Sequence, residues 1–271
     1  KGLNYGIDFK GGTLLEIKID NKNIKVSDLR NSLNILNLGD VNVKNFGDEG
    51  NYLIKIEKKI TNDKNFIKSI KSSLDQKIGE SINYRRVENV GPKVSAELLK
   101  SGVISIGLAL LVMLFYIWVR FEWQFSLGSI VALFHDVIIT LGLFSLLSIE
   151  INLSIVAAVL TIVGYSMNDT VVIYDRIREN LSKFTKLEIN EISNLSVNET
   201  LSRTLITSVT TLLALFSIFI LGGEILKGFS FAMILGVIIG TYSSIFVASP
   251  TLKLLSVSYK TLEKKEEKIV P

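Results

Sequence analysis

The chain has 271 residues, with 30 Lys and Arg against 26 Asp and Glu, a single His and no Cys. The absence of Cys excludes disulfide bonds, thiolate nucleophiles and iron–sulfur clusters, and one His cannot form a His-rich metal site, so we expect no metal ligands. A Ser-His-Asp triad would have to use His135, which lies inside an apolar run, so we expect no catalytic residues either. The basic residues are scattered and accompany no nucleic-acid-binding motif, which argues against nucleic acid as a partner.

Residues 1–90 are predicted to form a small α+β domain. Alternating apolar residues predict four strands, at residues 13–19, 40–46, 52–56 and 82–87. Apolar residues at helical spacing predict one helix between the first two strands and another between the last two. The resulting order, βαββαβ, is the ferredoxin-like pattern.

Five long apolar runs follow, and they predict a polytopic bundle of transmembrane helices across residues 91–252. The runs cover about residues 101–119, 125–149, 151–174, 204–223 and 228–252. Each has about 19 residues or more, enough for a helix that rises ~1.5 Å per residue to cross a hydrocarbon core of ~30 Å. Residues 91–100 are expected to form a surface helix that enters the first span. Residues 175–203 are expected to form a loop, and residues 253–271 a tail.

The basic residues of the short connections predict how the bundle is oriented. Segments 120–124 and 175–203, together with the tail from Lys253, hold eleven Lys and Arg, whereas the opposite connections near Glu150 and at 222–227 hold one. Because cytoplasmic loops carry the excess of basic residues, the N-terminal domain is predicted to be extracytoplasmic and the C-terminus cytoplasmic. A polar domain of this size needs a signal or an anchor to cross the membrane, so we expect a sixth, N-terminal span before Lys1.

The first candidate site centres on a carboxylate inside the third apolar run. An ionisable group in hydrocarbon is costly and is therefore a candidate for function. Asp169 has Ser166 and Asn168 beside it, and Arg203 enters the next span from the same side, followed by Thr207. Burial favours the neutral acid and a nearby cation favours the carboxylate, so a movable Arg203 would let Asp169 load and release a proton. The alternative is a static ion pair that fastens two helices.

A second carboxylate and a pair of glycines complete the candidate residues within the spans. Asp136 lies near the middle of its run, beside His135. Two roles are open for it: part of a proton relay, or a structural hydrogen bond to a neighbouring helix. Residues at i and i+1 do not share a helix face, so His135 is not expected to act together with Asp136. Gly236 and Gly240 are one helical turn apart and let another helix approach closely.

Several sequence blocks together resemble the SecF family of the SecD/SecF protein-export complex. The blocks are GIDFKGGT at residues 6–13, VGP at 90–92, GYSMNDTVV at 164–172, YDRIRE at 174–179, SRT at 202–204 and GTYSS at 240–244. Their order and their positions relative to the spans match the family across essentially the whole chain. Within these signatures, Asp8, Gly11 and Gly12 are expected to shape a turn near the membrane. Gly91 and Pro92 are expected to precede the first helix of the bundle.

The resemblance implies a membrane protein of the resistance-nodulation-division superfamily in the bacterial or archaeal cytoplasmic membrane. It implies SecD and the Sec protein-conducting channel as partners, an unfolded polypeptide as the translocated substrate, and the lipid bilayer as the surroundings. Energy would come from the proton-motive force, with sodium replacing the proton in some relatives, and no organic cofactor is expected. By this resemblance Asp169 and Arg203 are coupling residues. Asp136 joins them as a coupling candidate because it is a carboxylate within a span, and the spacing of Gly236 and Gly240 is interpreted as packing, toward SecD.

Three other functions remain open at this point. A non-conducting scaffold for SecD would need the helices but not the charges. A small-molecule exporter of the same superfamily is disfavoured, because the domain at residues 1–90 is too small to be the substrate-binding region of such an exporter. An intramembrane aspartyl protease would need two carboxylates on adjacent helices, which Asp136 and Asp169 supply, although the Gly-x-Gly-Asp context of such enzymes is missing.

Overall fold

The computed structural model describes residues 2–20, 24–34, 41–47, 49–57, 64–78 and 82–266. The chain divides into two compact units. One unit holds residues 4–103 together with the short segment 150–153, and the other holds most of the remaining chain, from residue 104 onward. Each unit is described by itself below.

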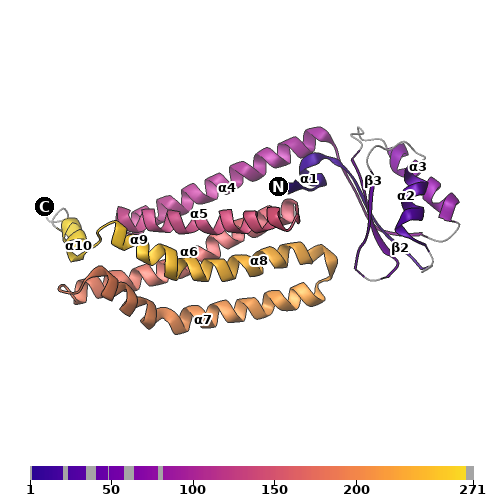
Figure 1. Cartoon of the computed structure of the whole chain (residues 1–271). Coiled ribbons are helices and arrows are strands. Elements are labelled where there is room, and N and C mark those ends of the chain that lie inside the picture. Colours follow the sequence, from indigo (N-terminus) through magenta and orange to yellow (C-terminus); the bar gives the residue numbers. More distant parts are fainter. Residues whose placement is uncertain are drawn as a thin grey trace. The chain divides into compact units, whose positions relative to one another are not determined.

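The first unit contains a four-stranded antiparallel sheet with two helices in the connections (Figure 1). The strands are β2 (Gly12–Ile19), β3 (Val41–Asn45), β4 (Asn51–Ile56) and β5 (Ile82–Val90), and the helices are α2 (Val26–Asn34) and α3 (Lys64–Ile78). The order across the sheet is β3-β4-β2-β5, so β2 is a central strand. Strand β5 continues three residues past the predicted end at residue 87, because Asn89 and Val90 still pair with Thr13 and Gly12.

The alternation of apolar residues builds the core of this unit. Leu15, Ile17, Ile54 and Ile56 point to one face of the sheet and are fully buried. Leu29 and Leu33 of α2, with Ile70 and Leu74 of α3, belong to the same buried cluster. Because side chains alternate across a strand, the residues between them, such as Lys18 and Lys55, lie on the other face.

A second, two-stranded sheet ties the start of the chain to the connection between two apolar helices. Strand β1 (Asn4–Tyr5) pairs in parallel with β6 (Glu150–Ile151), a contact between residues almost 150 positions apart. Helix α1 (Ile7–Lys10) follows β1 directly. Each of these strands has only two residues, too few to show an alternation of apolar and polar side chains. The sequence therefore did not predict this pairing.

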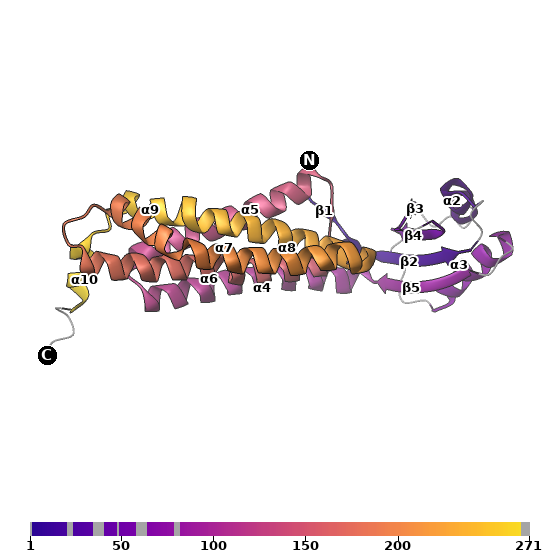
Figure 2. The same ribbon diagram turned by 90° about the horizontal axis from the view of Figure 1, so that it is seen from below.

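The five predicted apolar spans are confirmed: the described part of the chain holds five helices that are long and apolar enough to cross a membrane. They are α4 (Pro92–Arg120), α5 (Trp123–Leu146), α6 (Leu153–Lys183), α7 (Ile189–Leu221) and α8 (Gly223–Ser243), which continues through a π-helix (Ser244–Ala248) into α9 (Ser249–Leu254). Figure 2 shows α6, α7 and α8 running side by side. Half of the most apolar stretch is buried both in α6 and in the last span, which runs from α8 into α9, against 11% in α4, so α4 is the most peripheral of these helices.

The ends of the helices differ from the sequence prediction at three places. The expected surface helix at 91–100 and the first span form one continuous helix, which Pro92 begins. The expected loop at 175–203 is mostly helical, because α6 runs to Lys183 and α7 starts at Ile189. There the side chain of Glu188 caps the N-terminus of α7 in a capping box with Glu191. Hydropathy marks where a helix leaves the apolar layer, not where it stops. The expected tail contains a further helix, α10 (Tyr259–Glu266).

The π-helix interrupts what the sequence predicted as a single span at 228–252. Pro250 follows it at the start of α9. Proline lacks an N–H and cannot donate to the carbonyl four residues earlier, which favours a local change of helical register. The hydroxyl of Tyr174, on α6, donates to the carbonyl of Ala248 in the π-helix at 3.0 Å. Gly128 on α5 makes room for this hydroxyl, since a Cβ there would lie 2.3 Å from it.

Candidate functional site in the helix bundle

Asp136 on α5 is the most connected carboxylate of the bundle. Its side chain is 1% exposed. Ser166 on α6 donates to Oδ2 at 2.5 Å, and Ser243 on α8 donates to the same oxygen at 2.8 Å. Three helices therefore meet at one buried carboxylate, which we call the Asp136 cluster (Asp136, Ser166, Ser243 and His135).

His135 completes the cluster, contrary to the expectation that neighbouring residues would not act together. Its Nδ1 lies 3.0 Å from Oδ1 of Asp136. The imidazole is 26% exposed, so it joins the buried carboxylate to the edge of the bundle. The ring also stacks on Tyr242 of α8, with 6.3 Å between ring centroids. The helix-face argument was wrong here because it compares Cβ directions, whereas a long ring and a short carboxylate can bend toward each other.

Asp169 is equally buried but less well bonded. Its side chain is 2% exposed. Its Oδ2 has no hydrogen-bond partner within the described part of the chain. Arg203 on α7 is exposed and acts on Asp169 electrostatically. A buried carboxylate oxygen without a donor is costly, which makes Asp169 the less stable of the two charges.

The supporting polar residues are arranged differently from the prediction. Ser166 donates its hydrogen bond to Asp136 rather than to Asp169. Asn168 is exposed and so lies on another face of α6. Thr207 bonds to the carbonyls of Arg203 and Thr204 in its own helix, at 3.1 Å and 2.9 Å. The sequence neighbours of Asp169 therefore do not form its coordination shell.

A stripe of small polar residues on α7 was missed by the sequence reasoning. It consists of Ser196, Thr200, Thr204 and Ser208, all buried. Ser208 lies 2.8 Å from the hydroxyl of Thr241 on α8. The signal was present as a strict four-residue spacing, which places residues on one helix face.

Gly236 and Gly240 allow α8 to pack closely on α6 of this chain. A Cβ at Gly236 would lie 2.2 Å from the side chain of Ile162, and a Cβ at Gly240 would lie 2.9 Å from Cβ of Ser166. The expectation that these glycines face a partner subunit was therefore wrong. Gly240 brings Ser166 and Ser243 to opposite sides of the same carboxylate oxygen.

We predict that Gly240→Val lowers the stability of the bundle by about 1–3 kcal/mol, the usual cost of overpacking. The physical reason is that α8 must move away from α6, which also pulls Ser243 from Asp136. Thermal unfolding of the detergent-solubilised protein measures the effect. Gly142→Val is the matched control, since a Cβ at Gly142 meets no atom within 4 Å. Equal losses in the two variants would contradict the packing argument.

A charged network surrounds the turn between α6 and α7. Arg176 donates to Glu199 at 2.6 Å and to Glu179 at 2.6 Å. Asn180, which is buried, donates to Ser196 at 2.9 Å and to Glu199 at 2.7 Å. These contacts join α6 to α7 next to the turn, so the two helices form a braced hairpin there.

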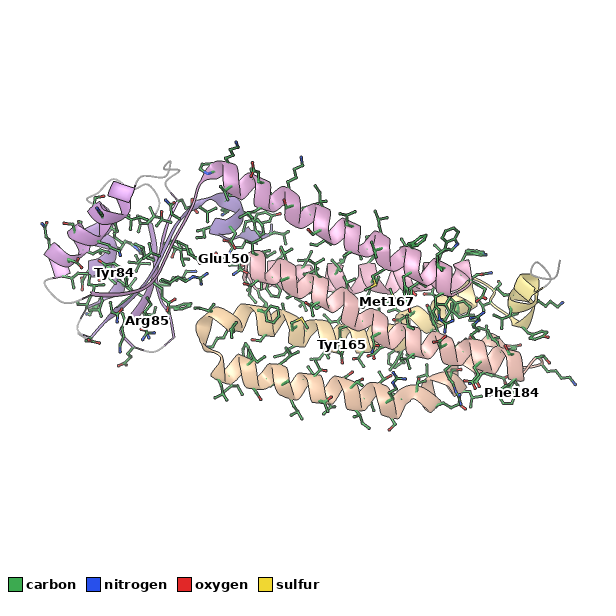
Figure 3. All side chains as sticks on the ribbon, turned by 180° about the vertical axis from the view of Figure 1, so that it is seen from behind. Tyr84, Arg85, Glu150, Tyr165, Met167 and Phe184 are labelled. Atoms are coloured by element: carbon green, nitrogen blue, oxygen red, sulfur yellow. The ribbon has the colours of Figure 1, made fainter. Side chains whose placement is uncertain are left out.

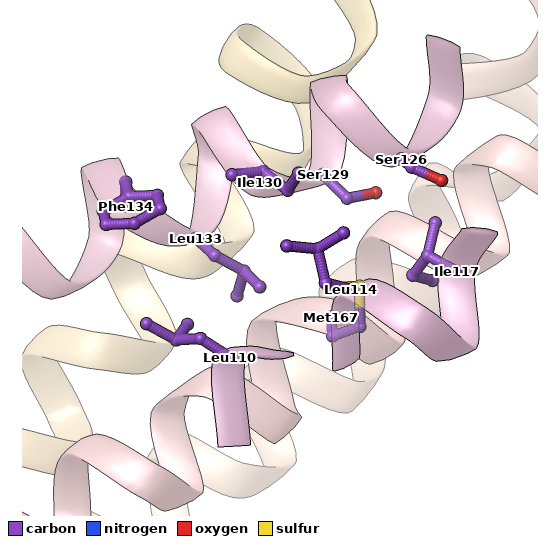
Figure 4. A pocket seen from close by; sticks show the side chains of 9 residues that line it. All are labelled: Leu110, Leu114, Ile117, Ser126, Ser129, Ile130, Leu133, Phe134 and Met167. Atoms are coloured by element: carbon purple, nitrogen blue, oxygen red, sulfur yellow. The ribbon is translucent and has the colours of Figure 1, made fainter. Parts of the chain in front are cut away.

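An apolar pocket in the bundle is a poor candidate for polar chemistry. It measures about 270 Å³, open solvent included, and is lined by residues of α4, α5 and α6 (Figure 4). Its lining is apolar except for Ser126 and Ser129. The hydroxyl of Ser129 already donates to the carbonyl of Phe125. The Asp136 cluster therefore remains the chemically distinctive part of the bundle. Figure 3 shows the side chains, with Tyr165 and Met167 labelled on α6.

The glycine-rich segment of the first unit has a structural role. Asp8 accepts a hydrogen bond from the backbone N–H of Leu153, the first residue of α6, at 2.9 Å. Gly11 and Gly12 have φ values of 79° and 134°, which residues with a Cβ rarely adopt. Gly91 precedes Pro92, the first residue of α4. These residues shape turns and begin helices.

Comparison with known families matches most of the chain. The family described as protein export membrane protein SecD/SecF, C-terminal, matches residues 70–258. The SecD/SecF GG motif matches residues 1–22. The chain is 46% identical over 256 residues to the protein translocase subunit SecF of Rickettsia akari, covering 93% of this chain and 82% of the relative. It is 43% identical over 267 residues to that of Cereibacter sphaeroides, covering 94% and 81%.

Solved structures show the same similarity in three dimensions. The crystal structure of SecDF, a translocon-associated membrane protein from Thermus thermophilus, matches with a TM-score of 0.82 and 36% identity. The match covers 93% of this chain and 34% of the SecDF chain. A super-membrane-facing form of SecDF matches with a TM-score of 0.62 and 34% identity, over 99% of this chain and 36% of that one. On family match, identity and structure together, this chain belongs to the SecD/SecF family of protein export membrane proteins.

Proposed function

We propose that the chain is a SecF-type accessory subunit of the protein translocase and works in a multi-pass cell membrane. Support comes from relatives named protein translocase subunit SecF, of which the chain covers more than four fifths. The five apolar helices agree with a transport subunit rather than an enzyme. Both oxygens of Asp136 are engaged by His135, Ser166 and Ser243, an arrangement unlike two carboxylates that share a proton in an aspartyl protease.

The proposal places the α+β unit on the extracytoplasmic side as a ferredoxin-like domain. Its support is the antiparallel order β3-β4-β2-β5 with α2 and α3 in the crossovers. The excess of basic residues on the opposite side of the bundle supports a cytoplasmic C-terminus. SecD, the Sec channel and the translocating polypeptide are the proposed partners, since both solved relatives are SecDF proteins and one of them is described as a translocon-associated membrane protein.

The proposal makes the buried carboxylates the coupling site for the proton-motive force, with a proton, or sodium in its place, as the coupling ion. The observation that carries it is Asp136, a buried carboxylate that holds hydroxyl donors from two other helices. A protonated Asp136 accepts hydrogen bonds less strongly, so loading the site weakens the contacts of α5 with α6 and α8. Asp169 and Arg203 form the second step, because a charge on one favours the opposite charge on the other.

The energies are of the right size for this coupling. One elementary charge that crosses 100 mV is worth ~2.3 kcal/mol. Interhelical hydrogen bonds in membranes contribute about 0.6 kcal/mol on average and at most ~1.7 kcal/mol. At the average value the two serine contacts of Asp136 are worth about 1.2 kcal/mol, so the energy of one ion is enough to exchange them for an alternative packing.

The test is Asp169→Asn in vesicles that contain the chain, a SecD subunit and the Sec channel. We expect force-dependent export to fall at least tenfold while assembly with SecD is unchanged, because the amide cannot be charged. Ion flux is recorded in the same vesicles under a proton gradient and under a sodium gradient, which identifies the ion. Asp175→Asn, an exposed carboxylate of the same helix, is the control. Full export by Asp169→Asn would show that Asp169 takes no part in coupling and has a structural role alone.

A further inference from the structure

The first unit carries a polar depression. It measures about 610 Å³, open solvent included, and is lined by residues of β1, α1, β3, β4 and β6. Its charged lining residues are Lys10, Lys44, Lys55, Glu57 and Glu150, the last labelled in Figure 3.

Three lysines converge on this depression from three different elements. Lys55 on β4 is half-buried and pairs with Glu150. Burial, followed by the charges of Lys44 and Lys10, lowers the pKa of Lys55 to about 8. Lys44 and Lys10 are exposed, and neither forms an ion pair with a described carboxylate. Like charges on neighbouring strands are unfavourable, so this arrangement of cations stores repulsion that an anion would relieve.

The position of Glu150 in the chain places the depression near the surface of the bilayer. Strand β6 lies in the connection between α5, which ends at Leu146, and α6, which begins at Leu153. Both helices are long and apolar enough to span the membrane. At ~3.3–3.6 Å per residue, Glu150 lies within about 11 Å of the first residue of α6. The headgroup layer extends ~5–8 Å beyond the hydrocarbon core on each side, so lipid phosphates lie at this depth.

We propose that this depression, formed by Lys10, Lys44 and Lys55 above Glu150, binds the phosphate of an anionic phospholipid headgroup. Lys10 and Lys44 provide two ammonium groups that form no ion pair with a described carboxylate, and Lys55 is paired with Glu150. Ammonium groups attract a phosphate as point charges, and basic pockets at membrane level bind lipid headgroups. A lipid is favoured over a soluble anion because its phosphate is permanently beside the site, at a high effective concentration. This proposal is independent of the ion-coupling site.

The experiment uses the full chain in vesicles of phosphatidylcholine with a minor fraction of phosphatidylglycerol. The protein is extracted in detergent, and the phosphatidylglycerol that remains per protein is quantified. We expect Lys10→Gln with Lys44→Gln to retain about fivefold less than the unsubstituted protein. Lys10→Arg with Lys44→Arg should retain it, because the charge is kept. Equal thermal unfolding of both double variants shows that neither has lost the fold.

The control removes two lysines of the same unit that do not line the depression, Lys93→Gln with Lys100→Gln. Retention at the level of the unsubstituted protein is expected there. An equal loss in this control would overturn the proposal in favour of general attraction to a basic surface. Displacement of the lipid by inorganic phosphate at millimolar concentration would overturn the lipid as the source of the phosphate. Displacement by an acidic peptide, but not by a neutral one, would assign the site to polypeptide instead.

Discussion

Asp136→Asn is expected to abolish ion-driven export while leaving the bundle folded. Ser166 and Ser243 both donate to Oδ2, so an amide oxygen in that place keeps both contacts. The amide NH2 then faces Nδ1 of His135, which accepts its hydrogen bond in one tautomer. Geometry is preserved and the ionisable group is lost. We expect at least a tenfold loss of force-dependent export in vesicles, with a thermal midpoint close to that of the unsubstituted protein.

Two further variants separate the charge of Asp136 from its hydrogen bonds. Ser243→Ala keeps the carboxylate and removes one donor, which should cost about 0.6–1.7 kcal/mol of stability and only part of the export. Asp136→Leu removes both functions and should lower stability as well as export, because two serine donors lose their acceptor. Normal export by Asp136→Asn, together with a loss in Asp136→Leu, would establish that Asp136 has a structural role alone.

Gly12→Ala is expected to destabilise the first unit by about 3 kcal/mol or more. Gly12 has φ of 134°, and a Cβ there would lie 2.6 Å from the carbonyl oxygen of Ile56. The neighbouring atom is backbone, so no side-chain rotation relieves the overlap. Because β2 is central, the disturbance reaches both β4 and β5. Hydrogen exchange of the β2 and β4 amides in the full chain should speed up about 100-fold, the equivalent of ~2.8 kcal/mol.

Two other glycines of the same region provide a graded control. Gly11→Ala should be intermediate, since φ is 79° and the nearest atom would lie 3.2 Å away. Gly91→Ala should have almost no effect, because a Cβ there meets nothing within 4 Å. A ranking in which Gly91→Ala is as damaging as Gly12→Ala would contradict the steric explanation.

The amino-acid sequence by itself determined the local properties of this protein. Five apolar runs predicted five membrane-capable helices, because length and hydropathy alone decide whether a helix can cross hydrocarbon. Alternating residues in segments such as 13–19 and 52–56 predicted strands, since only one face of the sheet meets the core. Asp136 and Asp169 stood out because placing a carboxylate in a membrane span costs free energy, and an apolar run reveals such a residue without any structure.

Only the tertiary structure decided which of these residues meet. Ser166 lies three positions from Asp169, yet it bonds to Asp136, because α6 presents it to α5. Gly240 and Ser243 contact the same site from α8, and β1 pairs with β6 almost 150 residues away. Spacing along a helix shows which side chains share a face, but not which neighbour that face meets. That choice depends on the rotation and offset of whole helices, which many distant packing contacts set together.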